Sequence, residues 1–230
     1  LVAEARPNPA HYALVALAAQ KPVTLVTQNV DGLHQRAGSQ HVIELHGNID
    51  RVICLGCGAT QARETVQLTL KEQNPAFFHA VAQTAPDGDA DLEHCGLDAF
   101  SVPQCGSCGG MLKPDVVFFG EGVPRTRVDA ALAALQEADA MLVVGSSLMV
   151  YSGYRFCEHA QTIGKPVAAI NRGRTRADHL FMLKVEAGCA EVLTELAETL
   201  SAIPPTARPG RNIEPTCPPT FLPTSRRLPN

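Results

Sequence analysis

Four of the eight cysteines in this 230-residue chain form two close pairs, Cys54 with Cys57 and Cys105 with Cys108. Two residues separate the cysteines of each pair, and a glycine follows the second cysteine. Such pairs can place four thiolates tetrahedrally around Zn²⁺, about 2.3 Å from the metal, and the glycine permits the tight turn that this requires. Because the protein would fill all four coordination positions, the spacing predicts a structural zinc site rather than a catalytic one.

A redox-active motif and a disulfide framework are weaker interpretations of these cysteines. Duplication with a trailing glycine favours the metal, and residues 1–8 do not resemble a secretory signal. Residues 58–104 separate the two pairs, far more than the roughly 15–20 residues of a compact zinc ribbon. The zinc module is therefore expected to carry a long insertion, with a turn-rich run at 84–90. The remaining cysteines are expected to be buried or free thiols, namely Cys95, Cys157, Cys189 and Cys217.

Three small polar turns each follow an apolar run that is typical of a buried strand. The runs are 23–27, 140–144 and 166–170, and the turns contain Gln28, Asn29 and Asp31, then Gly145, Ser146 and Ser147, then Asn171, Arg172 and Gly173. In open parallel sheets, ligands bind at the carboxyl ends of the strands. Solvated loops would explain one such turn, but three at one edge favour a site for a nucleotide-sized ligand.

Helical patterns separate these strands, at about 8–20, 127–138, 152–163 and 190–201. Asn8 followed by Pro9 is typical of a helix start, and Pro22 ends that pattern. Strands that alternate with helices imply crossover connections, because parallel strands cannot be joined by tight turns. The sequence therefore predicts an α/β fold with a parallel sheet that helices cover on both faces.

His46 lies in the sequence Glu44-Leu45-His46-Gly47, shortly before the first cysteine pair. Imidazole groups can accept and release protons near neutral pH, which suits general-base catalysis. Gly47 lets the backbone approach closely, and the first polar turn is nearby in the sequence. A lone histidine is more often structural, which is the expectation for His11, His41, His79, His94, His159 and His179.

Composition excludes several classes of protein. Apolar residues make up 45% of the chain and charged residues 18%, which argues against general disorder. A net charge of −4 argues against a strongly basic nucleic-acid binder, and no apolar run approaches the roughly 18 residues of a membrane span. Residues 204–230 are rich in proline and are predicted to be a disordered tail.

These features together resemble the sirtuin family. The matching motifs are, in order, Thr27-Gln-Asn-Val-Asp-Gly-Leu-His34, Glu44-Leu-His-Gly47, the two cysteine pairs, Leu112-Lys-Pro-Asp-Val-Val-Phe-Phe-Gly-Glu121, Val144-Gly-Ser-Ser-Leu148 and Ile170-Asn171. The combination is highly specific and covers about residues 8–203. The run 85–89 and the motif Val150-Tyr-Ser-Gly-Tyr-Arg-Phe156 look most like the mitochondrial-type subgroup and its bacterial relatives.

The resemblance implies an NAD-dependent protein-lysine deacylase that releases nicotinamide and acyl-ADP-ribose. His46 would be the general base, Asn29 would order the ribose or a water, and Asp31 would hold the nicotinamide amide. The rest of the NAD site would consist of Gln28, Gly145, Ser146, Ser147, Asn171, Arg172 and Cys189. The extended acyl-lysine peptide would add as a strand beside the segment Val117, Phe118, Phe119 and Gly120, with Val116 and Phe118 facing inward.

The sequence departs from the family pattern near its start. The Gly-Ala-Gly-type loop and the Asp-Phe-Arg-type motif of the family are not present, and the first residue is Leu1. We therefore expect an incomplete enzyme that lacks the first strand of the dinucleotide-binding sheet, binds NAD poorly and exposes a sheet edge. Two alternatives to deacylation follow, namely protein mono-ADP-ribosyl transfer and a catalytically incomplete zinc-bearing fragment.

The expected organisation is a Rossmann-like NAD-binding domain at 1–47 and 111–203, and a small zinc-binding module at 48–110. The expected ligands are NAD, zinc and acyl-lysine proteins or peptides, without nucleic acid or membrane. A monomer is expected. Reduced thiols that bind metal fit the cytoplasm, with the mitochondrial matrix as the alternative.

Overall fold

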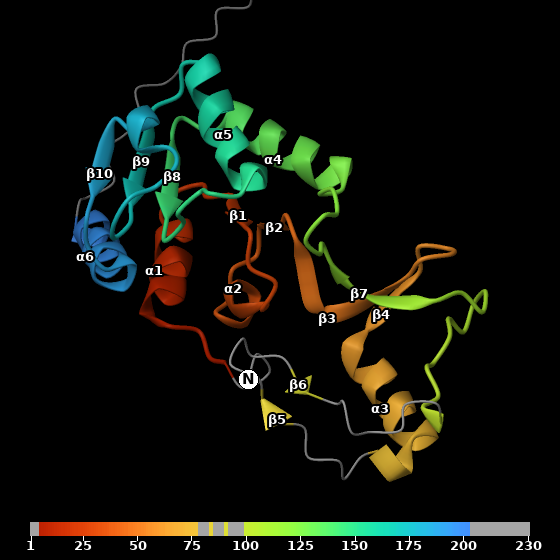
Figure 1. The fold of residues 1–230 in the computed structure, drawn as a ribbon. Helices are drawn as coiled ribbons and strands as arrows, with labels where there is room; N and C mark the ends of the chain where they lie inside the picture. Colours follow the sequence, from red (N-terminus) through yellow and green to blue (C-terminus); the bar gives the residue numbers. More distant parts are fainter. Residues whose placement is uncertain (1–4, 78–82, 85–89, 92–98, 203–230) are drawn as a thin grey trace, which may run out of the picture.

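The chain folds into two lobes in the computed structural model, which describes residues 5–77, 83–84, 90–91 and 99–202 (Figure 1). We call residues 5–46 and 117–202 the body, and residues 47–77 and 99–116 the module. Cys95, Cys217, His79, His94 and most of the turn-rich run and the proline-rich tail lie outside the described residues.

The strands of the body are all parallel, as the sequence predicts, but they form two sheets. The strands β8 (Met141–Val144), β9 (Val167–Ile170) and β10 (Leu183–Val185) pair in the order β10-β9-β8. The strand β1 (Leu25–Thr27) pairs with β2 (Val42–Glu44) and with no other described strand. Since no strand in the described residues pairs with both β1 and β8, the parallel strands form two separate ladders there.

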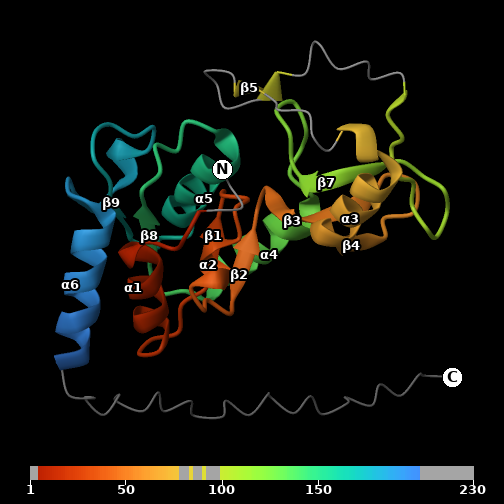
Figure 2. The same ribbon diagram turned by 90° about the horizontal axis from the view of Figure 1, so that it is seen from below.

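Helices cover both faces of the larger sheet, which confirms the predicted α/β layering. The helices α4 (Arg125–Glu137) and α5 (Tyr151–Thr162) lie on one face, and α1 (Pro9–Ala18) and α6 (Cys189–Ala202) lie on the other (Figures 1 and 2). The alternating side chains of β9 explain this: Val167 and Ala169 pack with α4 and α5, whereas Ile170 packs with α1 and α6. The layers therefore have separate apolar cores.

Local signals set the helix ends close to their predicted places. The Asn8 side chain accepts hydrogen bonds from the backbone N–H groups of Ala10 and His11 at the start of α1. The short helix α2 (Leu33–Arg36) follows the first polar turn, where the Asp31 carboxylate accepts from the Leu33 N–H at 2.9 Å. A single 3₁₀ turn at Asp178–Leu180 precedes β10.

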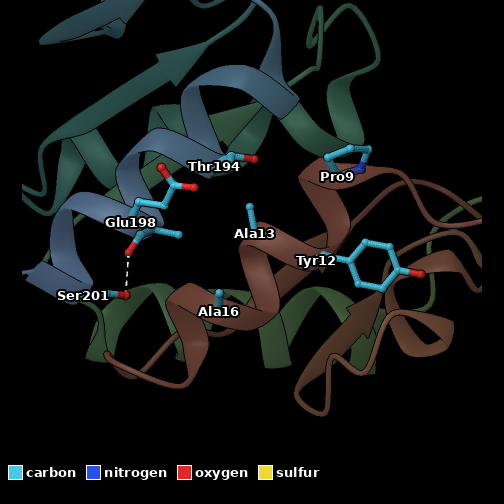
Figure 3. Close-up of a pocket in the computed structure, with 8 residues that line it drawn as sticks. Pro9, Tyr12, Ala13, Ala16, Thr194, Glu198 and Ser201 are labelled. Atoms are coloured by element: carbon cyan, nitrogen blue, oxygen red, sulfur yellow. Dashed lines mark hydrogen bonds between the residues drawn. The ribbon is translucent and has the colours of Figure 1, made fainter.

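The helices α1 and α6 are in extensive contact across a shallow groove of about 410 Å³ (Figure 3). Small side chains line much of it, including Ala13, Ala16 and Ala197, so the two helices can approach closely. Gln20 donates from its amide to the Ala197 carbonyl oxygen at 3.3 Å and to Ser201 Oγ at 2.9 Å. These contacts fasten the end of α1 to α6.

The module is a small antiparallel sheet with one helix. The strand β3 (Gly47–Cys54) lies between β4 (Thr60–Ala62) and β7 (Leu112–Val116), and α3 (Arg63–Gln73) and a 3₁₀ turn (Pro75–Phe77) follow β4. The predicted insertion thus contains α3 and a two-stranded pair, β5 (Gln83–Thr84) with β6 (Ala90–Asp91). The buried hydrophobic residues of the module are few, namely Val52, Cys54, Val66 and Cys105.

No helix in the described residues combines the length and the apolar character needed to cross a membrane.

Candidate active site and zinc centre

The four paired cysteines meet at one end of the module. Their Sγ atoms all lie within 4.8 Å of one another, with 3.5 Å between Cys54 and Cys108 and 3.7 Å between Cys57 and Cys105. Four sulfurs around Zn²⁺ at about 2.3 Å would be separated by about 3.8 Å, as tetrahedral geometry requires. The donor set, number and spacing therefore fit a zinc ion closed to further ligands.

The two halves of this cluster repeat one turn. The N–H of Gly58 donates to the Cys54 carbonyl oxygen at 3.0 Å, and that of Gly109 donates to the Cys105 carbonyl oxygen at 2.8 Å. Both glycines have positive φ, +73° and +70°, as expected for the residue after each pair. Gly110 leaves room for the sulfurs, because a Cβ there would lie 2.9 Å from Cys54 Sγ.

A cavity of about 750 Å³ opens between β1 and β8. The strand backbones 23–27 and 140–144 line it, and five of the predicted site residues face it, namely Gln28, Asn29, Gly145, Ser146 and Cys189. Amide, hydroxyl and backbone groups thus gather at the carboxyl ends of two strands, beside the first turn of α6. Such neutral donors suit a dinucleotide, whose diphosphate can be held by N–H and O–H groups.

The turn between β2 and β3 carries His46, whose side chain is half-buried. Its Nε2 lies 2.8 Å from Ser152 Oγ, at the start of α5. Gly47 is required there, because its φ is +87° and a Cβ would lie 1.9 Å from the Asp115 carbonyl oxygen. His46 is therefore fixed between the module strand β3 and the body.

Four charged residues brace the same turn. Asp115 on β7 accepts hydrogen bonds from Arg51 at 3.1 Å and from Arg127 at 2.7 Å. Arg51 also donates to Glu44 at 2.7 Å, at the end of β2. Because these residues come from β2, β3, β7 and α4, the network joins the two lobes around His46. Sequence reasoning missed this network, since charged residues without a motif do not show their partners.

The third polar turn, at the end of β9, is held by its own contacts. The Asn171 side-chain amide donates to the Arg172 carbonyl oxygen at 2.9 Å, and the Asn171 backbone N–H donates to Val185 at 3.1 Å. Arg172 and Ser147 are exposed. None of these three residues, and neither His46 nor Asp31, lines the cavity, although all lie in the loops around the strand ends.

The predicted substrate segment begins beside His46. The Val117 N–H donates to the His46 carbonyl oxygen at 2.8 Å, and Gly120 forms a turn with φ of +88°. Phe118 is 50% exposed and Phe119 is fully exposed, so the expectation that Phe118 faces inward is wrong. The Phe118 backbone leaves β7 at this point, and its ring lies against the Lys113 ammonium, which pairs with Glu121.

Two histidines lie near the cavity, His11, which was expected to be structural, and His34, the last residue of the first sirtuin-like motif. The rings of His11 and His34 are 4.7 Å apart, and both residues line the cavity. Burial, followed by the neighbouring His11, lowers the pKa of His34 from its ordinary value. His34 Nδ1 is buried and has no hydrogen-bond partner among the described residues. The neutral form of His34 is therefore favoured in the folded chain.

Comparison with known proteins agrees with this architecture. The profile of the Sir2 family matches residues 1–152. An NAD-dependent protein deacetylase of Xanthomonas campestris pv. campestris (strain 8004) is 58% identical over 195 residues, which cover 84% of this chain and 67% of that protein. An NAD-dependent protein deacetylase of Bordetella bronchiseptica is 57% identical over 194 residues, covering 84% of this chain and 71% of that protein. The chain thus spans about two thirds of the length of such relatives.

The fold resembles solved structures as well. A structure of Sir2 with a p53 peptide and NAD⁺ superposes with a TM-score of 0.67 at 30% identity, covering 86% of this chain and 72% of that one. A structure of Sir2 bound to acetylated peptide gives a TM-score of 0.66 at 30% identity, with the same coverage of both chains. Motifs, fold and relatives agree: this chain belongs to the Sir2, or sirtuin, family.

Proposed function

We propose that this chain is an NAD-dependent protein-lysine deacylase that releases nicotinamide and transfers the acyl group to ADP-ribose. The observation that carries the proposal is the position of His46. It is joined through Ser152 and Gln28 to the cavity at the strand ends, and its backbone bonds to Val117 on the predicted substrate segment. One imidazole thus lies between a dinucleotide-sized cavity and a segment that can accept a peptide. The family membership and the names of the relatives support the same activity.

The residues of the site have complementary roles in this proposal. NAD, when bound, supplies a ribose carbon that becomes electrophilic as nicotinamide leaves. His46 accepts a proton from a ribose hydroxyl as general base, Asn29 orders the ribose or a water, and Asp31 holds the nicotinamide amide. The diphosphate and adenosine side is held at the strand ends by Gln28, Gly145, Ser146, Ser147, Asn171, Arg172 and Cys189.

The acyl-lysine peptide binds in an extended form beside Val117–Gly120 in this proposal. Residues 118–120 are exposed. The Phe118 N–H donates to Glu121 Oε2 at 2.9 Å and its carbonyl oxygen accepts from the Glu121 N–H at 3.0 Å, so an added strand would replace these two bonds. Main-chain hydrogen bonds would supply affinity with little dependence on the peptide sequence. Zinc bound by Cys54, Cys57, Cys105 and Cys108 would act structurally, by closing the module on which β7 depends.

Product analysis tests the activity. The zinc-loaded chain is incubated with NAD and a mixture of acyl-lysine peptides, and the products are identified by mass. Acyl-ADP-ribose is expected, and His46→Ala is expected to slow its formation about 10²–10⁴-fold, the range for loss of a general base. His41→Ala is the matched control, because that histidine is exposed and lies just before β2, the strand that His46 follows.

Three other outcomes would contradict the proposal. Free nicotinamide or ADP-ribosylated protein without deacylation would favour mono-ADP-ribosyl transfer. An equal rate in His46→Ala would remove the assigned base. A folded, zinc-loaded chain that gives no product would identify these residues as a zinc-bearing fragment without the activity.

The binding of NAD is expected to be weak in this chain. No described strand links β1 to β8, so the groups on the two sides of the cavity are not fixed by a common hydrogen-bond ladder. Ordering them on binding costs part of the affinity. Titration calorimetry is expected to give a dissociation constant above the micromolar range, and submicromolar binding would contradict this expectation.

The cellular setting completes the proposal. Reduced thiols that hold a metal fit a reducing compartment, which favours the cytoplasm. We propose a monomer without nucleic-acid or membrane partners, in keeping with the net charge of −4. Sedimentation analysis of the zinc-loaded chain would test the monomer.

A further inference from the structure

Ser152 is a polar residue that the sequence motifs do not assign to any role. It lies in the first turn of α5 and is only 8% exposed. Its Oγ lies 2.8 Å from His46 Nε2, although 106 positions separate the two residues. The same Oγ accepts a hydrogen bond from Gln28 Nε2 at 3.3 Å. Among the described residues, Ser152 Oγ has no other hydrogen-bond partner.

These bonds continue as a chain in which each hydroxyl proton has one acceptor within reach. The Leu148 backbone N–H can only donate, and it donates to Ser146 Oγ at 3.2 Å. The Ser146 hydroxyl then donates to Gln28 Oε1 at 3.3 Å. The Gln28 NH₂ group then points toward Ser152 and donates to its Oγ, and the proton of this buried hydroxyl needs an acceptor of its own. The acceptor that remains for that proton is His46 Nε2.

We propose that Ser152 is a positioning residue that holds His46 with a bare Nε2, ready to act as a base. The inference rests on the proposed function. A neutral imidazole carries one proton, so an acceptor at Nε2 means that the proton is on Nδ1. A general base needs an exposed lone pair on the nitrogen that faces the reacting hydroxyl. Ser152 selects that tautomer, which is the one that can accept the proton of a ribose hydroxyl at Nε2.

Gly153 supports this arrangement independently. A Cβ at Gly153 would lie 2.7 Å from Gln28 Oε1 and 3.0 Å from Gln28 Nε2, so the Gln28 amide rests directly against the helix backbone. A glycine inside a helix is less favourable than an alanine. The Ser152-Gly153 pair thus combines a buried hydroxyl with the space that the Gln28 amide needs to reach it.

Nitrogen NMR of the imidazole rings reads the tautomer without any turnover. In the zinc-loaded, ¹⁵N-histidine-labelled chain, the His46 signals are identified by their loss in His46→Ala. The wild type is expected to show a protonated Nδ1 and a bare Nε2, and Ser152→Ala is expected to shift the ring to a mixture of tautomers. A protonated Nε2 in the wild type, or an unchanged tautomer in Ser152→Ala, would overturn the proposal.

Kinetics provide the second readout. Ser152→Ala is expected to lower kcat for deacylation about tenfold, the size of one lost hydrogen bond, and to leave the KM for NAD within about twofold. Ser152→Thr keeps the hydroxyl and is expected to recover most of the rate. Thr162→Val is the matched control, because it removes a hydroxyl that bonds only to a backbone carbonyl at the far end of α5.

The outcomes separate this proposal from the proposed function. An equal loss in Thr162→Val, or a KM increase without a kcat decrease in Ser152→Ala, would mean that Ser152 only stabilises α5, which overturns the positioning role. If the wild type shows no deacylation, the proposed function fails, and the NMR result alone then decides whether Ser152 sets the tautomer of His46.

Discussion

Cysteine has opposite roles in the two lobes. In the body, Cys157 is fully buried among apolar side chains of α4, α5 and β9, and burial raises the pKa of its thiol to about 11. In the module, hydrogen bonds from the backbone N–H groups of Ser107 and Cys108 lower the pKa of Cys105 to about 6. The Cys157 thiol is kept protonated as a small apolar group, whereas the backbone around Cys105 favours a thiolate there. Side-chain hydrogen bonds with Cys54 and Cys57 raise the pKa of Cys108, so the neighbouring thiols share their protons.

The contrast extends to what stabilises each lobe. The body has two apolar clusters, one on each face of its larger sheet. The module has few buried apolar residues besides two of its four clustered cysteines. A lobe with a small core needs another source of stability, and a bound metal supplies it through ligand bonds. The body therefore depends on apolar burial and the module on its thiolates.

Removal of zinc should have the largest effect on stability, and this effect should be confined to the module. Structural zinc sites supply on the order of 10 kcal/mol of binding free energy to the folded state. Chelation is expected to raise hydrogen exchange throughout β3, β4 and β7, measured by mass spectrometry of peptides, while β8, β9 and α6 stay protected. Excess zinc should reverse the change. An equal loss of protection in both lobes would contradict the contrast.

Truncation of a buried side chain in the core of the body should have the next largest effect on the free energy of unfolding. Leu193 on α6 is fully buried, so Leu193→Ala is expected to lower the free energy of unfolding by about 2–5 kcal/mol. Leu196 on the same helix is 37% exposed and serves as the control, with a smaller expected loss. Urea unfolding and zinc analysis measure both properties. Loss of zinc from Leu193→Ala would show that the module is not independent of this core.

The charged network between the lobes should contribute less to the free energy of unfolding. Asp115→Asn leaves Arg51 and Arg127 without their shared carboxylate and is expected to cost about 2 kcal/mol. This is below the 3–5 kcal/mol of a fully buried pair, because the Arg51 side chain is 41% exposed. Asp129→Asn removes an exposed pair with Arg125 and should cost close to nothing. Equal unfolding free energies for the two variants would exclude a role of this network in joining the lobes.

The smallest predicted effect is a pH dependence that comes from Cys157. Its folded-state pKa, about 11, lies above the ordinary value of 9.0, so the thiol form stabilises the folded chain. This contribution is complete below pH 9 and is lost as the pH rises from 9 toward 11. Cys157→Ala is expected to unfold with a flatter dependence on pH between 9 and 11. Parallel curves for the two proteins would contradict the assignment.

Sequence periodicity and motifs predicted most elements of the body to within about two residues. They missed the short strands β2 and β10, whose three residues each are too few for a period to show. They missed α3 as well, because polar residues dominate it and only Val66 is buried. The end of β7 could not be located closely enough from the sequence to orient Phe118.

The zinc cluster could be predicted because its ligands are tied to their spacing in the sequence. The contacts of His46 could not, because Ser152 in α5 and Gln28 and Ser146 in two loops are brought together only by the fold. The Val150–Phe156 motif did point to the start of α5. It gave no indication that a serine there would contact a histidine in the turn after β2. Local patterns thus find ligand pairs, whereas long-range hydrogen bonds need the structure.

The space between β1 and β8 has a mechanical consequence. Across this space the described strands share no backbone hydrogen bonds. The two sheets, β1-β2 and β10-β9-β8, are instead linked by the side-chain hydrogen bonds among His46, Ser152, Gln28 and Ser146. Each such bond contributes only about 1 kcal/mol, so the two sheets can shift relative to each other at low cost. A dinucleotide that contacts both sheets would restrict this motion. Its binding should stiffen the whole body and raise its melting temperature well beyond the loops that it touches.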